Sequence, residues 1–325
     1  MILTTKMTVS ERGANADMSN TVTKGKISTV YKRELALMLR SNIGWIFMAV
    51  NVAALCIFTA WLCIRNGYPT YEYAAEVATT VNCFAAAFLC AFTVSAEGRR
   101  GETAMISRFV SPVKLVIGKY LAQLTLFAVP SVISALLPLV VLPYGKLDLL
   151  NSYMGSVGYI LFGMAILAFS SFVCSLIKHK WVAFSVTTVL SLLLNIASNV
   201  AKVVESYQTA YFVFVAAVII AVGCVFLLLL LDNTVIPVVF ACVFSVLTFI
   251  FSISGVLADV VRGVISFISP QYSFSELIYG TVSITAIVQP VFMTVIYLIF
   301  FSLKLANGRR DMTFTLNNSS RKEEN

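Results

Sequence analysis

Residue types that commonly carry out catalysis or hold metal ions are scarce in this sequence. His179 is the only histidine, and it lies between Lys178 and Lys180 in a short polar segment, where we expect a solvated side chain. A zinc site or a His-containing triad within one chain is therefore nearly excluded. The seven cysteines are Cys56, Cys63, Cys83, Cys90, Cys174, Cys224 and Cys242. All lie in apolar stretches without zinc-site spacing, so we expect buried thiols and predict no cofactor.

The sequence also lacks a loop that could hold the phosphates of ATP. Gly118-Lys119-Tyr120 has neither the upstream glycine nor the hydroxyl residue of a G-x-x-x-x-G-K-[ST] motif. Ionisable residues are few within the apolar stretches: Glu76 lies at the beginning of one, and Asn82 and Asn195 are polar but uncharged. Carriers coupled to protons or sodium usually keep acidic residues at mid-depth. The sequence therefore argues against a secondary transporter and predicts a chain that is not an enzyme.

The composition is that of a membrane protein. Of the 325 residues, 59% are hydrophobic and 12% are charged, and the mean hydropathy is +0.90. Soluble domains are nearer half apolar and a quarter charged, so this chain cannot cover itself with polar surface in water. The net charge of +8 is explained by basic residues on the inner side of a membrane. No nucleic-acid partner is expected.

Apolar stretches long enough to cross a bilayer begin near Gly44, too far into the chain for a secretory signal peptide. The expected spans are 44–64, 75–95, 117–142, 153–177, 181–201, 210–231, 235–257 and 284–305. Only Leu231-Asp232-Asn233-Thr234 separates two of them, which reads as a tight turn. The predicted fold class is an all-α polytopic membrane protein of about eight transmembrane helices. A six-span core plus one extra hairpin describes it equally well.

The basic residues predict which side of the membrane each connection faces. With a cytoplasmic N-terminus, 19 of the 23 Lys and Arg residues lie on the inner side. The four that remain outside are Arg65, Lys146, Lys202 and Arg262. Because the opposite topology would invert this bias, the positive-inside rule places both termini in the cytoplasm.

The segment 24–43 is predicted to be an amphipathic helix in the inner membrane interface. Its basic residues lie mostly off a stripe of apolar residues at helical spacing. The stripe consists of Ile27, Val30, Tyr31, Leu35, Met38 and Leu39. Such a helix would bury its apolar face in membrane lipid, with its basic residues near anionic headgroups. A plain extension of the first span is the alternative, and residues 1–23 are predicted to form a disordered tail.

Two connections are longer than simple turns. The cytoplasmic loop 95–119 mixes charged residues with an apolar patch that includes Phe109, and a short amphipathic helix would end before Ser111-Pro112. The patch is either a docking surface for a partner or an interfacial helix facing lipid. On the outer side, 258–283 is amphipathic and broken at Ser269-Pro270. A re-entrant or interfacial helix pair would keep the charges of this segment near water.

The loop 95–119 carries residues that resemble the ABC-2 type permease family, most closely the gliding-motility and copper-enzyme-maturation permeases. The family pattern begins with an acidic residue followed by basic residues and a glycine. A Ser-Pro pair comes next, and then a Gly-Lys pair at the beginning of the third span. The matching residues are Ala96-Glu97, Arg99-Arg100-Gly101, Ser111-Pro112-Val113 and Val116-Ile117-Gly118-Lys119-Tyr120-Leu121. The segment Lys32-Arg33-Glu34-Leu35 is similar to the family's N-terminal interfacial helix. The residues Ser269-Pro270, Phe274 and Gly280 resemble its extracellular re-entrant segment.

The resemblance covers most of residues 24–305 and implies a multi-pass, non-catalytic permease subunit of the cell membrane, with residues 306–325 as a cytoplasmic tail. Its partners would be a cytosolic ABC ATP-binding subunit and a second permease subunit, identical or homologous, and export is the expected direction. The expected docking residues are Glu97, Arg99, Arg100, Glu102 and Arg108, with Phe109 as the apolar anchor. The interfacial helix would contribute Lys32, Arg33 and Glu34, and the re-entrant segment Arg262, Pro270 and Glu276.

Two departures from the family keep a second interpretation open. The order Gly101-Glu102-Thr103-Ala104 differs from the family pattern, and the hairpin at 210–257 exceeds the usual six spans. A membrane scaffold or accessory protein with an ABC-2-like fold, transporting nothing, is therefore the alternative. A polytopic membrane enzyme would need clustered His, Asp or Ser residues at one membrane face, which the sequence lacks.

Overall fold

The computed structural model describes residues 27–65, 71–95, 111–144, 148–177, 179–203, 269–278 and 284–323, with the isolated positions 223, 243–245, 263 and 267. Every regular element within these ranges is a helix, so the prediction of an all-helical chain is confirmed for them. The predicted hairpin at 210–257 lies outside the described residues apart from four isolated positions.

Five helices are long and apolar enough to cross a membrane, with lengths from 24 to 33 residues. They are α3 (Asn42–Phe58) continued by the π-helical η1 (Thr59–Arg65), α4 (Tyr71–Cys90) continued by η2 (Ala91–Ser95), α6 (Pro112–Val141) with a final 3-10 turn η4 (Leu142–Tyr144), α7 (Leu149–Leu176) and the part of α13 (Ile284–Glu323) that ends at Asn307. A 24-residue helix is about 36 Å long, which exceeds the ~30 Å hydrocarbon core of a bilayer. These helices correspond to the predicted spans 44–64, 75–95, 117–142, 153–177 and 284–305.

A sixth helix, α8 (Lys180–Val203), occupies the position of the predicted span 181–201. Its apolar stretch Lys180–Asn195 is shorter than those of the five long helices. A short helix, α12 (Pro270–Ile278), precedes α13 and packs against α7, α8 and α13. It lies beside the first turns of α7, because a Cβ at Gly158 would lie 2.5 Å from Cδ2 of Phe274.

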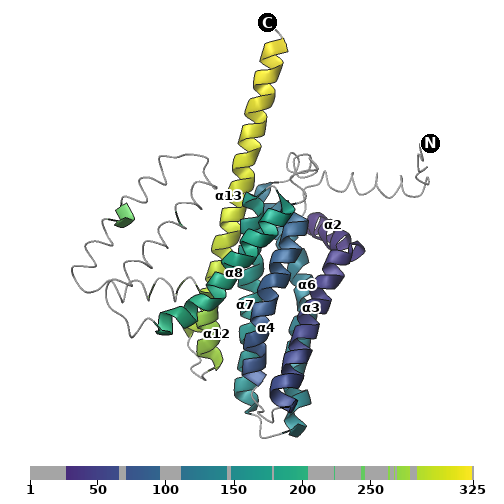
Figure 1. The fold of residues 1–325 in the computed structure, drawn as a ribbon. Helices are drawn as coiled ribbons and strands as arrows, with labels where there is room; N and C mark the ends of the chain where they lie inside the picture. The colour runs from purple at the N-terminus through teal and green to yellow at the C-terminus, as the bar shows by residue number, and fades with distance from the viewer. Residues whose placement is uncertain are drawn as a thin grey trace, which may run out of the picture.

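The long helices form a bundle around α7 (Figure 1). Inside this bundle, 78% of the apolar stretch of α7 is buried, compared with 39% for those of α3, α6 and α13. Small residues let the neighbouring helices approach α7 closely. A Cβ at Gly163 would overlap the ring of Phe127 on α6, and a Cβ at Gly155 would touch Glu72 on α4. The close packing of α6 against α7 therefore depends on Gly163, whereas the space at Gly155 would admit a Cβ.

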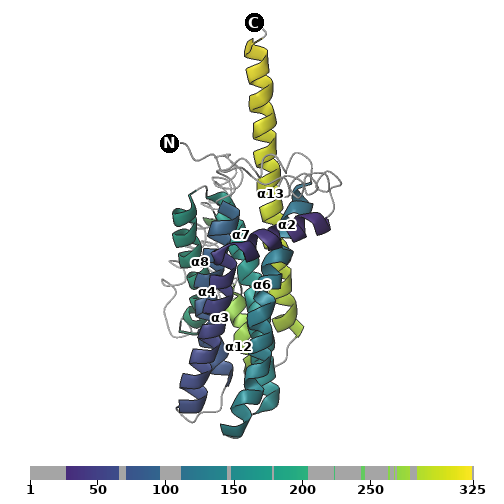
Figure 2. The same ribbon diagram turned by 90° about the vertical axis from the view of Figure 1, so that its right-hand side faces the viewer.

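The first described helix, α2 (Ile27–Arg40), is separate from α3 and crosses the end of the bundle (Figure 2). Ser41 interrupts the helical path, with φ −88° and ψ 147° in the extended region. Its hydroxyl donates a hydrogen bond to the carbonyl of Met38 at 2.9 Å, and the indole N–H of Trp45 donates to the carbonyl of Leu39 at 2.9 Å. These bonds satisfy carbonyls at the end of α2, so α2 is not a plain extension of the first long helix.

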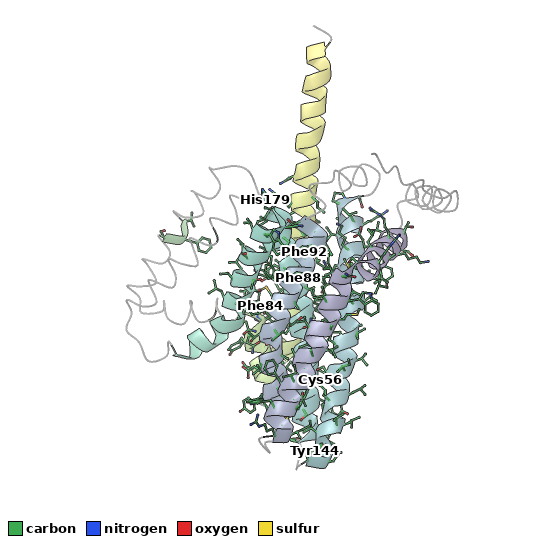
Figure 3. All side chains as sticks on the ribbon, turned by 45° about the vertical axis from the view of Figure 1, so that its right-hand side comes forward. Cys56, Phe84, Phe88, Phe92, Tyr144 and His179 are labelled. Carbon is green, nitrogen blue, oxygen red and sulfur yellow. The ribbon has the colours of Figure 1, made fainter. Side chains whose placement is uncertain are left out.

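The two ends of the bundle carry different residues. His179 marks the end where α2 lies, and Tyr144 marks the opposite end (Figure 3). All three tryptophans are exposed near an end of a helix, with Trp45 60%, Trp61 54% and Trp181 62% exposed. Trp45 and Trp181 lie toward the α2 end and Trp61 toward the other. Tryptophan collects at the two membrane–water interfaces, so this pattern fits a bundle embedded in a bilayer.

Candidate functional site

Five of the twelve predicted site residues lie in the part of the chain that the structure describes. Lys32, Arg33 and Glu34 belong to α2, Pro270 is the first residue of α12, and Glu276 belongs to α12 with its side chain undescribed. The docking residues Glu97, Arg99, Arg100, Glu102, Arg108 and Phe109, together with Arg262, lie outside the described residues. Two regions of the described part carry polar groups in positions that need an explanation.

The first region is the junction where α2 packs on α6. A Cβ at Gly118 would lie 2.7 Å from Cγ1 of Val30 and 3.3 Å from the backbone nitrogen of Tyr31. Glycine is therefore required for this close approach. Next to the contact, Val30 and Leu115 are buried and pack with Leu305 of α13. The junction thus ties α2 to the beginning of α6 and to the end of the apolar part of α13.

The buried face of α2 differs in part from the predicted apolar stripe. Val30, Glu34 and Met38 are buried, whereas Ile27 and Leu39 of the stripe are exposed. The face that α2 buries therefore packs on protein rather than entirely in lipid, and it includes an acidic residue. Spacing alone does not distinguish protein from lipid as the partner of an apolar stripe.

Two charged side chains of opposite sign are buried in the helices that meet at the junction. Glu34 is 3% exposed and Lys119 of α6 is 4% exposed. Nη1 of Arg33 lies 3.8 Å from Oε1 of Glu34, while Lys32 is exposed on α2. Buried charges need compensation from partners of opposite sign. The junction therefore concentrates charge at the α2 end of the bundle.

The second region is a polar cluster that links α4, α8 and α12, formed by Glu76, Thr79, Asn195 and Gln271. The amide of Asn195 donates to Oγ1 of Thr79 at 3.2 Å, and Thr79 lies 3.4 Å from Oε1 of Gln271. The amide of Gln271 donates to Oε1 of Glu76 at 3.2 Å. Thr79 lies about 12 Å along α4 from its first residue, so the cluster reaches well into the bundle. Ser269 extends it by donating to the carbonyl of Leu194 at 2.8 Å.

Three buried polar side chains of these same three helices have no hydrogen-bond partner among the described residues. They are Asn82 on α4, Thr188 on α8 and Ser273 on α12. Asn82 is fully buried, and both its amide nitrogen and its carbonyl oxygen lack a partner there. Unpaired buried polar groups cost about 1–3 kcal/mol each, so a sequence that keeps them invites a functional explanation.

Further hydrogen bonds join other helices of the bundle. The hydroxyl of Tyr71 lies 2.7 Å from Oγ of Ser134, which connects α4 with α6. The hydroxyl of Tyr159 on α7 donates to Oδ1 of Asn51 on α3 at 3.3 Å. Ser171 on α7 donates to the side chain of Gln123 on α6 at 2.8 Å. Such bonds hold membrane helices together, and they account for these polar residues structurally.

The chemistry available in the two regions is hydrogen bonding and charge pairing. Among the described residues, no three His, Cys, Asp or Glu side chains gather in a way that could hold a metal ion. Sequence reasoning singled out Asn82 and Asn195 as polar but missed Thr79 and Gln271. The spacing of Thr79, Asn82 and Cys83 at one to four residues on an apolar helix is the signal that could have found Thr79, whereas no local signal points to Gln271.

No family model, no curated protein and no solved structure matches this chain. Its resemblance to ABC-2 type permeases therefore depends on the sequence motifs alone.

Proposed function

We propose that this chain is the transmembrane permease subunit of an ABC transporter of the ABC-2 type, which exports its substrate across the cell membrane. A separate cytosolic subunit would bind and hydrolyse ATP, and a second permease subunit, identical or homologous, would complete the path. The fold would be a six-span core plus the hairpin at 210–257, with both termini in the cytoplasm. The five long helices together with α8 supply six helices for such a core.

The observation that carries this proposal is the crosswise helix α2 at one end of the bundle. The ends of the helices that flank residues 96–110 lie at this same end. The hydroxyl of Ser95 donates to the carbonyl of Ile177 at 2.7 Å, next to His179, and α6 begins at Pro112, six residues before its contact with Val30. A partner docked at this end would therefore reach α2 and the helix ends that flank residues 96–110 together.

The same geometry supports a route by which movement could pass from the partner to the helices. Because Val30 packs on Gly118 without space between them, a displacement of α2 would be transmitted to α6. Rocking of the helices would then part the polar cluster of α4, α8 and α12. ATP-driven closure of the partner subunits is the expected cause of this rocking. The hydrogen-bonding groups of this cluster, once exposed, could bind the polar part of an amphipathic substrate.

The test is a mild-detergent purification of the tagged full-length chain from its native membrane, with identification of its partners and assay of ATPase activity. The test variant is the double substitution Arg99→Glu and Arg100→Glu, and the control is Arg65→Glu at the opposite end of the bundle. We expect an ATP-binding subunit to co-purify with the wild type and the control, and to be lost from the double variant. Recovery of the chain alone, or with a partner that lacks ATPase activity, would favour the accessory-protein alternative and contradict the proposal.

A further inference from the structure

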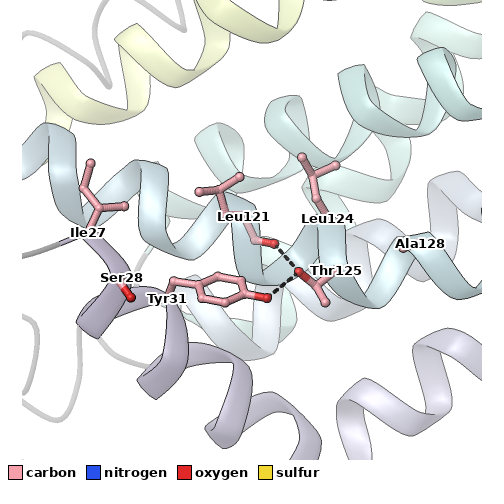
Figure 4. A pocket seen from close by; sticks show the side chains of 7 residues that line it. All are labelled: Ile27, Ser28, Tyr31, Leu121, Leu124, Thr125 and Ala128. Carbon is pink, nitrogen blue, oxygen red and sulfur yellow. Dashed lines mark hydrogen bonds between the residues drawn. The ribbon is translucent and has the colours of Figure 1, made fainter.

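A groove of about 590 Å³ lies between α2 and α6 (Figure 4). Ile27, Ser28 and Tyr31 of α2 form one wall, and residues from Leu121 to Ala128 of α6 form the other. The groove is open toward the surroundings of the bundle. It is separate from the polar cluster of α4, α8 and α12.

The walls of the groove present mainly carbon. The hydroxyl of Tyr31 lies 3.0 Å from Oγ1 of Thr125, and Thr125 also donates to the carbonyl of Leu121 at 2.9 Å. Because these hydroxyls bond within the protein, they do not require a polar occupant. Apart from Ser28, the remaining lining is aliphatic and consists of Ile27, Leu121, Leu124 and Ala128. An apolar occupant is therefore the one that the walls favour.

The position of the groove matches the boundary between headgroups and hydrocarbon. Its wall on α6, one of the five long apolar helices, extends about 10 Å along the helix axis. This wall leads away from α2 toward the middle of the apolar helix. The other wall of the groove is α2, which crosses the end of the bundle (Figure 2). The exposed Trp45 lies at this helix, because its indole N–H donates to the carbonyl of Leu39 at 2.9 Å. An occupant of the groove would thus have one end at the interface and the other in the hydrocarbon.

Basic residues lie where the headgroup of such an occupant would be. Lys32 follows Ser28 by four residues and therefore shares its side of α2, and it is exposed. Lys114 precedes Leu121 by seven residues, two turns along the same side of α6, and it is also exposed. Two exposed positive charges beside an apolar groove are complementary to a negatively charged phosphate with an attached acyl chain.

We propose that the groove binds one acyl chain of an anionic phospholipid, with the phosphate of its headgroup near Ser28 and Lys32. The volume of the groove lies in the range of small-ligand pockets. A docked helix, which is about 10–12 Å across with its side chains, would need more space. The bound lipid would brace the angle between α2 and α6. This inference stands independently of transport.

The experiment uses the full-length chain in phosphatidylcholine vesicles that contain a minor fraction of phosphatidylglycerol with a photoactivatable group in its acyl chain. We expect cross-links on α6 between Leu121 and Ala128, and unlabelled phosphatidylglycerol should compete better than phosphatidylcholine. Ala128→Trp fills the groove and should abolish the cross-links, whereas Val132→Trp, exposed one turn farther along α6, should leave them intact. Lys32→Gln should weaken apparent binding about fivefold, which corresponds to ~1 kcal/mol per basic residue near the surface.

Three outcomes would overturn the proposal. A phosphatidylcholine probe that labels the same residues equally well would show ordinary surrounding lipid rather than a site for anionic lipid. Labelling that persists in Ala128→Trp would place the lipid outside the groove. Absence of phosphatidylglycerol labelling between Leu121 and Ala128 in the wild type would show that protein, such as a second copy of the chain, covers the groove instead of lipid. Thermal melting of each variant shows that any lost labelling does not come from unfolding.

Discussion

Gly118 of α6 and Val30 of α2 lie so close that a Cβ on the glycine would be 2.7 Å from Cγ1 of the valine. The side chain of valine is branched at Cβ and has little freedom to move aside. We therefore predict that Gly118→Ala lowers the stability of the folded protein by about 1–3 kcal/mol through overpacking. The cost of overpacking exceeds the gain in helix stability of about 1 kcal/mol that replacing glycine with alanine usually brings.

The measurement is thermal unfolding of the purified protein in detergent, with Gly155→Ala as the matched control. A Cβ at Gly155 would lie 3.4 Å from Cα of Glu72, an ordinary contact distance, so this control should be neutral or stabilising. Equal melting temperatures for the two variants would show that α2 does not pack on α6 as closely as described.

The burial of Glu34 leads to a second prediction. Glu34→Lys places another positive charge in a buried position next to Arg33, whose Nη1 lies 3.8 Å from Oε1 of Glu34. We expect a loss of about 3–5 kcal/mol, as is typical for a broken buried charge pair. The exposed Lys32 provides the control, since Lys32→Glu should change stability by less than about 0.5 kcal/mol.

Lys119 extends this prediction to a charge reversal. Because Lys119 is buried in α6 and α2 packs on that helix, we expect Lys119→Glu to restore part of the stability lost in Glu34→Lys. Unfolding of the single and double variants measures the coupling directly. Strictly additive losses would mean that the two charges are compensated independently of each other.

The polar cluster predicts a difference between two threonines of the same continuous helix. Thr79→Val removes the hydroxyl that accepts a hydrogen bond from the amide of Asn195 at 3.2 Å and lies 3.4 Å from Oε1 of Gln271. The variant also removes a bond of 2.6 Å to the carbonyl of Glu76 in the same helix, so the interhelical contact with Asn195 is what distinguishes Thr79 from Thr93. Thr93→Val removes only a bond to the carbonyl of Leu89 in its own helix, at 2.7 Å. We expect Thr79→Val to lower stability by about 0.6–1.7 kcal/mol more than Thr93→Val does. Comparable melting temperatures would argue that the cluster does not join α4 to α8 and α12.

The long helices could be predicted from the sequence because a run of about 20 apolar residues has few alternatives to a spanning helix. The predicted span 284–305 agrees closely with the apolar part of α13, Ile284–Asn307. The predicted span 117–142 begins five residues later than α6, which starts at Pro112 and includes the exposed Lys114 in its first turn. Proline is favoured at the first position of a helix, and long basic side chains near a helix end can reach the interface.

The two regions of interest were less predictable because they depend on contacts between distant residues. Gln271 and Glu76 are 195 residues apart in the chain, so no local pattern pairs them. The burial of Glu34 was also hidden, because helical spacing shows which residues share a face of α2 without showing what covers it. The separate helix in segment 24–43 could be predicted from its basic residues, whereas its packing against Gly118 could not.

Asn82 provides a test that separates stability from function. Its amide is fully buried in α4 without a partner among the described residues, so Asn82→Leu removes an unpaired polar group and should keep or raise the melting temperature. Asn51→Leu is the control: Asn51 accepts a bond from Tyr159 at 3.3 Å, so its loss should lower the melting temperature. If the unpaired amide forms a hydrogen bond with a substrate during transport, Asn82→Leu should remain folded but lose substrate-stimulated ATPase activity in the reconstituted complex. Such a variant would gain stability and lose activity. Full stimulation in this variant would remove Asn82 from the transport path and leave its burial without a functional role.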